Sequence, residues 1–210
     1  FHTGTASEEH FSIDHILNDG SWPGSETMLI DLLNRGLYFY KITDAATDKL
    51  IYSRGFASVF GEWQTIPEAA ENWGTFHESL RFPWPKLPVK LTIEKRDAKN
   101  NFIPVWSTTI DPKSRMVNPS MLKSPYKSFT YVENGKPVDH VDIVILGDGY
   151  TAGEMGKFHK DVTTLTNELF NVEPFKSRKS DFNVRAVETP SASSGVNKPH
   201  PGVFKRTPLS

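Results

Sequence analysis

The 210-residue sequence contains no cysteine, no long apolar run and no excess of either charge. Without cysteine there can be no disulfide, no thiol nucleophile and no cysteine-ligated zinc. No apolar run approaches the roughly 20 residues that a membrane-spanning helix needs. Lysine and arginine number 24 against 25 acidic residues, for a net charge of -1. Bulk electrostatics therefore favour neither nucleic acid nor an anionic membrane as a partner.

A signal peptide is also missing from the sequence. The first residue is Phe1 rather than methionine, so we expect that the start of the chain has been trimmed. An export signal that has been removed is compatible with this start.

Proline (15), glycine (14) and aromatic residues (12%) are abundant, which is typical of proteins built from strands and turns. The character of the chain changes near residue 125, after the segment "DPKSRMVNPSMLKSP" (111–125), which has three prolines and little periodicity. We therefore expect a β-sandwich domain over residues 1–124 and the beginning of an α/β domain over residues 125–210.

The first part is predicted to consist of short strands. The runs "LYFYKI" (37–42) and "KLIYSRGF" (49–56) are aromatic and β-branched, and the polar segment between them predicts a hairpin loop. Apolar and polar residues alternate in "VKLTIEKR" (89–96), as in a half-buried strand. Pro104 in "FIPVWSTTI" (102–110) indicates an edge position or a bulge. Short strands at this spacing favour an immunoglobulin-like β-sandwich.

The second part predicts a strand, a helix and a strand. "VDIVIL" (141–146) is nearly continuously apolar, which is typical of a strand covered on both faces. Thr151 and Glu154 form a capping box before a helix, and "DFNVRAVE" (181–188) is the next strand. This order favours a parallel crossover connection. Upstream, Asn134-Gly135 predicts a hairpin turn. One such unit cannot cover both faces of its own strands, so we expect the second domain to be incomplete.

The turn between strand and helix, "LGDGYT", allows three interpretations. Glycines at the start of a helix can hold phosphate, but the G-x-G-x-x-x-G spacing is one residue longer than the dinucleotide motif, Asp148 is negative, and no Walker lysine follows. The turn also resembles the block that opens lipase-like serine hydrolases, but Gly149 stands where the nucleophile would be. The third interpretation is structural: Gly147 and Gly149 allow a tight turn, Asp148 forms an Asx turn, and Thr151 caps the helix. We favour this third interpretation for residues Gly147, Asp148, Gly149, Tyr150 and Thr151.

The sequence contains seven histidines but no H-E-x-x-H zinc motif. "HESLR" (77–81) begins like this motif but has Arg81 at its fifth position, and it lies in the β-rich part. His10 and His15 are not spaced as ligands on one helix or strand, and we expect His140 and His159 to be solvated. No histidine is therefore assigned as a ligand. Trp84, between Pro83 and Pro85, is the tryptophan that we most expect to be exposed, and we consider it a candidate for surface binding.

Four blocks of the sequence resemble a known family. They are "SRGFASVFGEWQTIPEA" (53–69), "TFHESLRFPWPKLPVKL" (75–91), "VDIVILGDGYTAGEMGKF" (141–158) and "EPFKSRKSDFNVRAVETPSASSG" (173–195). In this order they are similar to the IgA peptidase family of bacterial zinc metalloendopeptidases. The resemblance implies an N-terminal β-sandwich followed by a zincin-like catalytic domain, a protein substrate, and export to the medium or the cell envelope.

The resemblance also implies that zinc is bound by the full-length enzyme. The family's H-E-x-x-H motif has no counterpart here and is expected beyond Ser210, so no zinc ligand and no catalytic base is assigned, and the 210-residue chain alone is expected to be inactive. The turn at residues 147–151 matches the family but receives no catalytic role. The alternative hypothesis is that the β-sandwich is a binding module for a protein or a glycan, with no catalysis.

Overall fold

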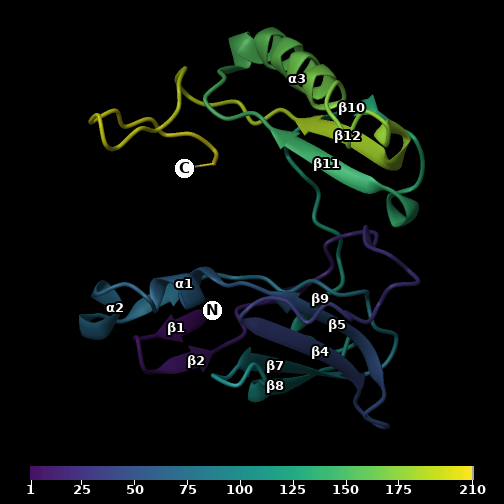
Figure 1. Ribbon diagram of the computed structural model, residues 1–210, viewed down its shortest axis with the longest axis vertical. Coiled ribbons are helices and arrows are strands. Elements are labelled where there is room, and N and C mark those ends of the chain that lie inside the picture. Colours follow the sequence, from purple (N-terminus) through teal and green to yellow (C-terminus); the bar gives the residue numbers. More distant parts are fainter. Residues whose placement is uncertain (210) are drawn as a thin grey trace. The chain divides into compact units, whose positions relative to one another are not determined.

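The computed structural model describes residues 1–209 and divides the chain into two compact units (Figure 1). Unit 1 consists of Phe1–Trp22 and Glu26–Leu122, and unit 2 consists of Pro23–Ser25 and the chain from Lys123 onward. Each unit is described by itself. Within residues 1–209, every helix is too short or too polar to cross a bilayer.

The main sheet of unit 1 has four antiparallel strands in the order β5-β4-β7-β8. The predicted hairpin is confirmed, because β4 and β5 pair and Asp44 accepts hydrogen bonds from the turn between them. β8 is an edge strand, and its register shifts beside Pro104, as predicted. The bounds of the strands are Tyr38–Asp44 (β4), Leu50–Phe56 (β5), Val89–Arg96 (β7) and Phe102–Ile110 (β8).

One face of this sheet forms the core of unit 1. Val89, Leu91 and Ile93 in β7 are buried, as the alternation predicts. The alternation fails at Glu94, which is also buried and pairs with Lys41 at 2.8 Å. Aromatic rings from β4 and β5 fill the space beside them. The buried members of the core are Tyr38, Tyr40, Ile42, Tyr52, Val89, Leu91, Ile93, Ile110 and Val117.

Two smaller sheets and two short helices complete unit 1. One sheet has the order β2-β1-β6 and is antiparallel throughout, and the other pairs β3 with β9 in parallel. Ser58 caps α1 by accepting a hydrogen bond from the amide of Gly61. The unit is thus mostly β-sheet, as predicted. The bounds are His2–Gly4 (β1), Glu9–Phe11 (β2), Ile16–Leu17 (β3), Val59–Trp63 (α1), Glu68–Glu71 (α2), Gly74–Phe76 (β6) and Val117–Asn118 (β9).

Unit 2 has a three-stranded sheet in the order β10-β12-β11, with helix α3 packed on one face. β11 and β12 are parallel, which confirms the predicted crossover, and β10 is antiparallel to β12. The bounds are Ser128–Val132 (β10), Pro137–Asp139 (η1), Val141–Leu146 (β11), Ala152–Glu154 (η2), Met155–Leu169 (α3), Lys179–Asp181 (η3) and Phe182–Val187 (β12).

The predicted hairpin at Asn134-Gly135 is wrong. β10 does not pair with β11, because β12 lies between them. The buried side chain of Asn183 holds the Asn134-Gly135 segment instead. Its Oδ1 accepts from the amide of Asn134 at 2.8 Å, and its Nδ2 donates to the carbonyl of Gly135 at 3.0 Å. A side chain from a distant strand therefore replaces the expected strand partner.

The faces of β11 and α3 also depart from expectation. Val144 and Leu146 are exposed, so β11 is covered on one face only within residues 1–209. In α3, Phe158 and Val162 are buried as predicted, but Leu165 is 62% exposed and Thr166 is buried in its place. At about 100° per residue, position 166 is displaced from position 162 by a smaller angle around the helix axis than position 165 is, and in the opposite direction. Thr166 therefore stays on the buried side that Val162 occupies.

Candidate functional site

The turn after β11 is held by close packing of its glycines. Gly147 lies against the ring of Phe158, where an added Cβ would meet ring carbons at 3.1 Å. Gly149 has a φ of +76°, and its added Cβ would lie 2.7 Å from the carbonyl carbon of Gly195. The backbone of Gly149 accepts a hydrogen bond from the amide of Gly195 at 2.8 Å and donates to Ser191 at 3.2 Å. The turn thus joins β11 to the segment that follows β12.

The side chains of the turn mostly have local partners. Thr151 and Glu154 form the predicted capping box, and hydrogen bonds from the amide and the hydroxyl of Thr151 lower the pKa of Glu154. Tyr150 donates to Asp161 at 2.8 Å, and this hydrogen bond raises the pKa of Tyr150. Asp148 departs from the predicted Asx turn, because its buried Oδ1 has no hydrogen-bond partner within residues 1–209. The absence of any role in catalysis stays a prediction for these five residues.

Trp84 is 43% exposed and lies beside a shallow hollow of about 240 Å³ in unit 1. Ile42, Ile51 and Phe82 form part of the wall of the hollow, and Lys86 adds a positively charged side chain to it. A flat indole next to apolar side chains can pack against a sugar or an apolar side chain of another protein. Its role in binding stays a prediction.

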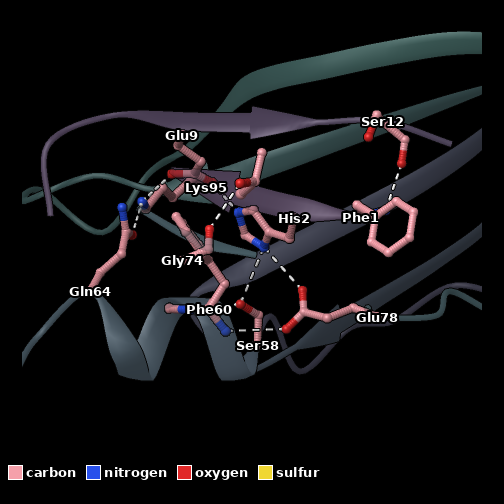
Figure 2. Close-up of polar contacts among 12 residues, drawn as sticks. Phe1, His2, Glu9, Ser12, Ser58, Phe60, Gln64, Gly74, Glu78 and Lys95 are labelled. Atoms are coloured by element: carbon pink, nitrogen blue, oxygen red, sulfur yellow. Dashed lines mark hydrogen bonds and ion pairs between the residues drawn. The ribbon is translucent and has the colours of Figure 1, made fainter. Parts of the chain in front are cut away.

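A polar cluster in unit 1 surrounds His2, as Figure 2 shows. The imidazole of His2 is 2% exposed; its Nδ1 lies 3.0 Å from Glu78 and its Nε2 lies 3.1 Å from Glu9. Each ring nitrogen therefore lies within hydrogen-bond distance of a carboxylate oxygen, and a ring nitrogen that carries a hydrogen donates to it. The rings of Phe11 and Phe60 pack against the imidazole, with their centroids 4.2 and 3.9 Å from its own.

Lysine and tyrosine extend this cluster. Lys95 pairs with Glu9 and also donates to Gln64 at 2.9 Å (Figure 2). Burial by itself would raise the pKa of Glu9, but the hydrogen bonds from His2 and Lys95 outweigh it, and the pKa is lowered. Burial and the neighbouring Glu9 carboxylate raise the pKa of Tyr38. The contacts of the cluster therefore favour the ionised form of Glu9.

The His2 cluster contains the residue types of a serine hydrolase but not the geometry. Ser58 Oγ lies 3.4 Å from Nδ1 of His2, but this oxygen already accepts from the amide of Gly61 at 2.8 Å. Ser58 is buried, and aromatic rings cover His2, so a substrate has no access to either. The cluster can hold strands and a helix together, but it cannot attack a substrate.

A second histidine cluster lies in unit 2. His159 on α3 is only partly exposed, so the prediction of a solvated side chain is wrong. Its Nε2 lies 2.8 Å from Glu188, its Nδ1 bonds to the hydroxyl of Tyr131, and its ring packs on Phe129. These contacts join α3 to β10 and to the end of β12. His140 is likewise only partly exposed, and its Nδ1 lies 3.1 Å from the carbonyl oxygen of Lys136, so the prediction of a solvated side chain is wrong here too.

One group of side chains in the described chain has the composition of a metal site. Asp14, His15 and His77 are exposed in unit 1, and their ligand atoms lie within 4.8 Å of one another. Spacing along the chain contains no signal for this group, because His15 and His77 are 62 residues apart and become neighbours only in the folded unit.

Comparison with family models covers both units. Residues 1–107 match the model described as Peptidase M64 N-terminus, and residues 130–210 match the model described as IgA Peptidase M64. No curated protein matches the chain.

Proposed function

The chain belongs to the IgA Peptidase M64 family, and on this premise we propose that it supplies the N-terminal part of a zinc metalloendopeptidase that hydrolyses peptide bonds in proteins. The observation that carries the proposal is the order of the two matches. The N-terminal segment of the family covers residues 1–107, and the peptidase segment follows over residues 130–210. Protein is the substrate class that follows from this family.

The residues of this chain do not fit the family's catalytic zinc. His77 and Glu78 start an H-E pair, but the fifth residue is Arg81 and no helix is formed there. Glu78 is occupied structurally, since it contacts His2 and accepts from the amide of Phe60 at 3.3 Å. We therefore derive no catalytic step from these residues and propose that the H-E-x-x-H motif is supplied by chain that follows Ser210.

The finer features of the fold belong to the same proposal. Unit 1 would be an immunoglobulin-like β-sandwich, supported by its antiparallel four-stranded sheet with one buried face. Unit 2 would open a zincin-like catalytic domain, supported by the parallel β11-α3-β12 arrangement. The exposed Val144 and Leu146 on β11 are apolar surface that a larger domain would cover. Export to the medium or the cell envelope, by a bacterium, completes the proposal.

The test begins with the gene. We expect the codons after Ser210 to encode H-E-x-x-H on an amphipathic helix pattern within about a hundred residues. The longer protein should then bind zinc and cleave protein substrates in a chelator-sensitive way, whereas residues 1–210 alone should not. A stop codon directly after Ser210, or chelator-sensitive proteolysis by residues 1–210, would contradict the proposal.

Exposed Trp84 supports a second candidate function, a module that binds a protein or a glycan. The indole and the hollow beside it offer an apolar surface with a nearby lysine. A panel of glycans and immunoglobulins should then bind the 210-residue chain, and Trp84→Ala should abolish binding. Trp73→Ala is the matched control, because Trp73 is also exposed but does not line the hollow. An empty panel would exclude this candidate.

A further inference from the structure

The topology of the small sheet in unit 1 brings together three side chains that are distant in sequence. Both β2 and β6 are antiparallel to the central strand β1, and both Phe11 and Phe76 are paired with His2. β2 and β6 therefore run in the same direction, and the chain leaves them at the same end of the sheet. Asp14 and His15 follow soon after Phe11, and His77 follows Phe76 directly.

The three side chains converge at this end. Oδ2 of Asp14 lies 2.9 Å from Nδ1 of His15 and 3.1 Å from Nε2 of His77. The imidazole rings of His15 and His77 lie beside each other, with centroids at 5.8 Å. Two imidazole nitrogens and one carboxylate oxygen, from two separate segments of the chain, thus lie within 4.8 Å of one another.

We propose that Asp14, His15 and His77 bind a divalent transition-metal ion of the zinc class. A tetrahedral zinc ion with bonds of about 2.0–2.1 Å places its ligand atoms about 3.4 Å apart. The observed separations from Asp14 are only a few tenths of an ångström shorter, so small outward movements of exposed side chains would admit the ion. A water molecule would take the fourth position.

The donor set selects the class of ion. Imidazole nitrogens suit zinc, nickel, copper and cobalt, whereas calcium and magnesium prefer sites made of oxygen alone. The side chains of Asp14, His15 and His77 are 40%, 54% and 57% exposed, so a metal ion can enter without unfolding the sheet. The bound ion would clip the segment after β2 to the segment after β6.

The proposed site does not use the family's catalytic motif. It lies in unit 1, outside residues 130–210, and it contains no H-E-x-x-H motif. The proposed role of the site is to stabilise the N-terminal unit. The metal-site proposal can therefore be tested independently of any peptidase activity.

The test is metal binding by the 210-residue chain after chelator treatment and dialysis. Calorimetric titration with zinc chloride should give one ion per chain, and calcium chloride should give no binding. His77→Gln, His15→Asn and Asp14→Asn should each weaken zinc binding at least tenfold. His10→Asn is the control, because His10 is exposed on β2 but lies outside the cluster, and it should bind zinc like the unchanged protein.

Two further measurements separate ligand loss from misfolding. The midpoint of thermal unfolding without metal should be the same in all four variants, and zinc should raise it only in the unchanged protein and in His10→Asn. The visible absorption spectrum of cobalt bound to the unchanged protein should show nitrogen ligands, and this measurement requires no variant. The proposal is overturned if the unchanged chain binds no zinc, if His77→Gln binds it equally well, or if the cobalt complex shows no nitrogen ligand.

Discussion

Nε2 of His2 lies 3.1 Å from Oε1 of Glu9, in the interior of unit 1 and on neighbouring strands. This contact joins β1 to β2, and the other ring nitrogen reaches Glu78 beyond β6. Lys95 on β7 bonds to the second oxygen of Glu9. One buried imidazole and one carboxylate therefore connect the small sheet to the main sheet of the unit.

Replacing His2 with asparagine should lower the free energy of unfolding of unit 1 by about 2–4 kcal/mol, because it leaves two mostly buried carboxylates short of a partner and opens space against Phe60. All five tryptophans lie in unit 1, so urea unfolding followed by tryptophan fluorescence measures this unit. His10→Asn is the matched control on the exposed side of β2 and should change stability by less than about 0.5 kcal/mol. Equal stability of the two variants would show that the His2 contacts contribute nothing.

The lowered pKa of Glu9 predicts that unit 1 is sensitive to acid. A carboxyl whose pKa is lower in the folded state stabilises that state at pH values above its unfolded pKa, which for Glu9 is the ordinary glutamate value of 4.5. This contribution is lost as the pH falls through the folded pKa. Urea unfolding between about pH 3 and pH 7 should therefore show stability declining below about pH 4.5.

The substitution Glu9→Gln isolates this contribution. It should lower stability at neutral pH and flatten the acid decline, because the group that titrates has been removed. Glu8→Gln, at the neighbouring exposed carboxylate, should leave the profile unchanged. The same acid decline in Glu9→Gln and in the unchanged protein would assign the decline to other groups.

Two glycines in unit 2 should respond to alanine in opposite directions. Gly149→Ala should destabilise the unit by about 1–3 kcal/mol, because its φ of +76° is strained for alanine and the new Cβ would lie 2.7 Å from the backbone of Gly195. Gly156→Ala in α3 should stabilise the unit by about 0.5–1 kcal/mol, because alanine has a higher helix propensity than glycine. Within the described residues, the added Cβ would have no atom within 4 Å apart from its chain neighbours and the backbone of its own helix. Hydrogen exchange of the amides in β11 and β12 measures both effects, and a neutral Gly149→Ala would show that the turn can relax.

Asn183→Ala should destabilise unit 2 by about 2–3 kcal/mol, since it removes the hydrogen bonds to Asn134 and Gly135 and leaves their backbone groups without this partner. Asn171→Ala, at an exposed position after α3, is the control and should have little effect. Hydrogen exchange should show the loss first at the amides of residues 133–136. Unchanged protection there would mean that the segment is held by other contacts.

Local patterns predicted most of the individual elements correctly. Alternation in residues 89–96 identified β7, and the capping box at Thr151 and Glu154 identified the start of the helical segment. These signals depend on residues within one or two turns of each other, so they can be read directly from neighbouring letters. The exposure of Trp84 followed in the same way from its two flanking prolines.

Pairings between distant segments could not be predicted. Asn134-Gly135 has the composition of a hairpin turn, which would pair β10 with the next strand in the chain. Instead β10 pairs with β12, about fifty residues later. His2 gave no sign that it would be buried between two glutamates, since Glu9 and Glu78 become its neighbours only through the register of β1, β2 and β6. Such choices are made by summed packing and hydrogen bonding over the whole unit, which no local pattern contains.

The sequence by itself determined the β-rich first half, the strand-helix-strand order of the second half and the family, because each depends on short-range patterns or on blocks of residues in order. Only the tertiary structure decided which polar side chains meet. His159 joins Glu188 and Tyr131, and Asp14 joins His15 and His77. The physical reason is that strand pairing and register determine which side chains lie next to each other. The pairing is set by the lowest free energy of the folded unit rather than by distance along the chain.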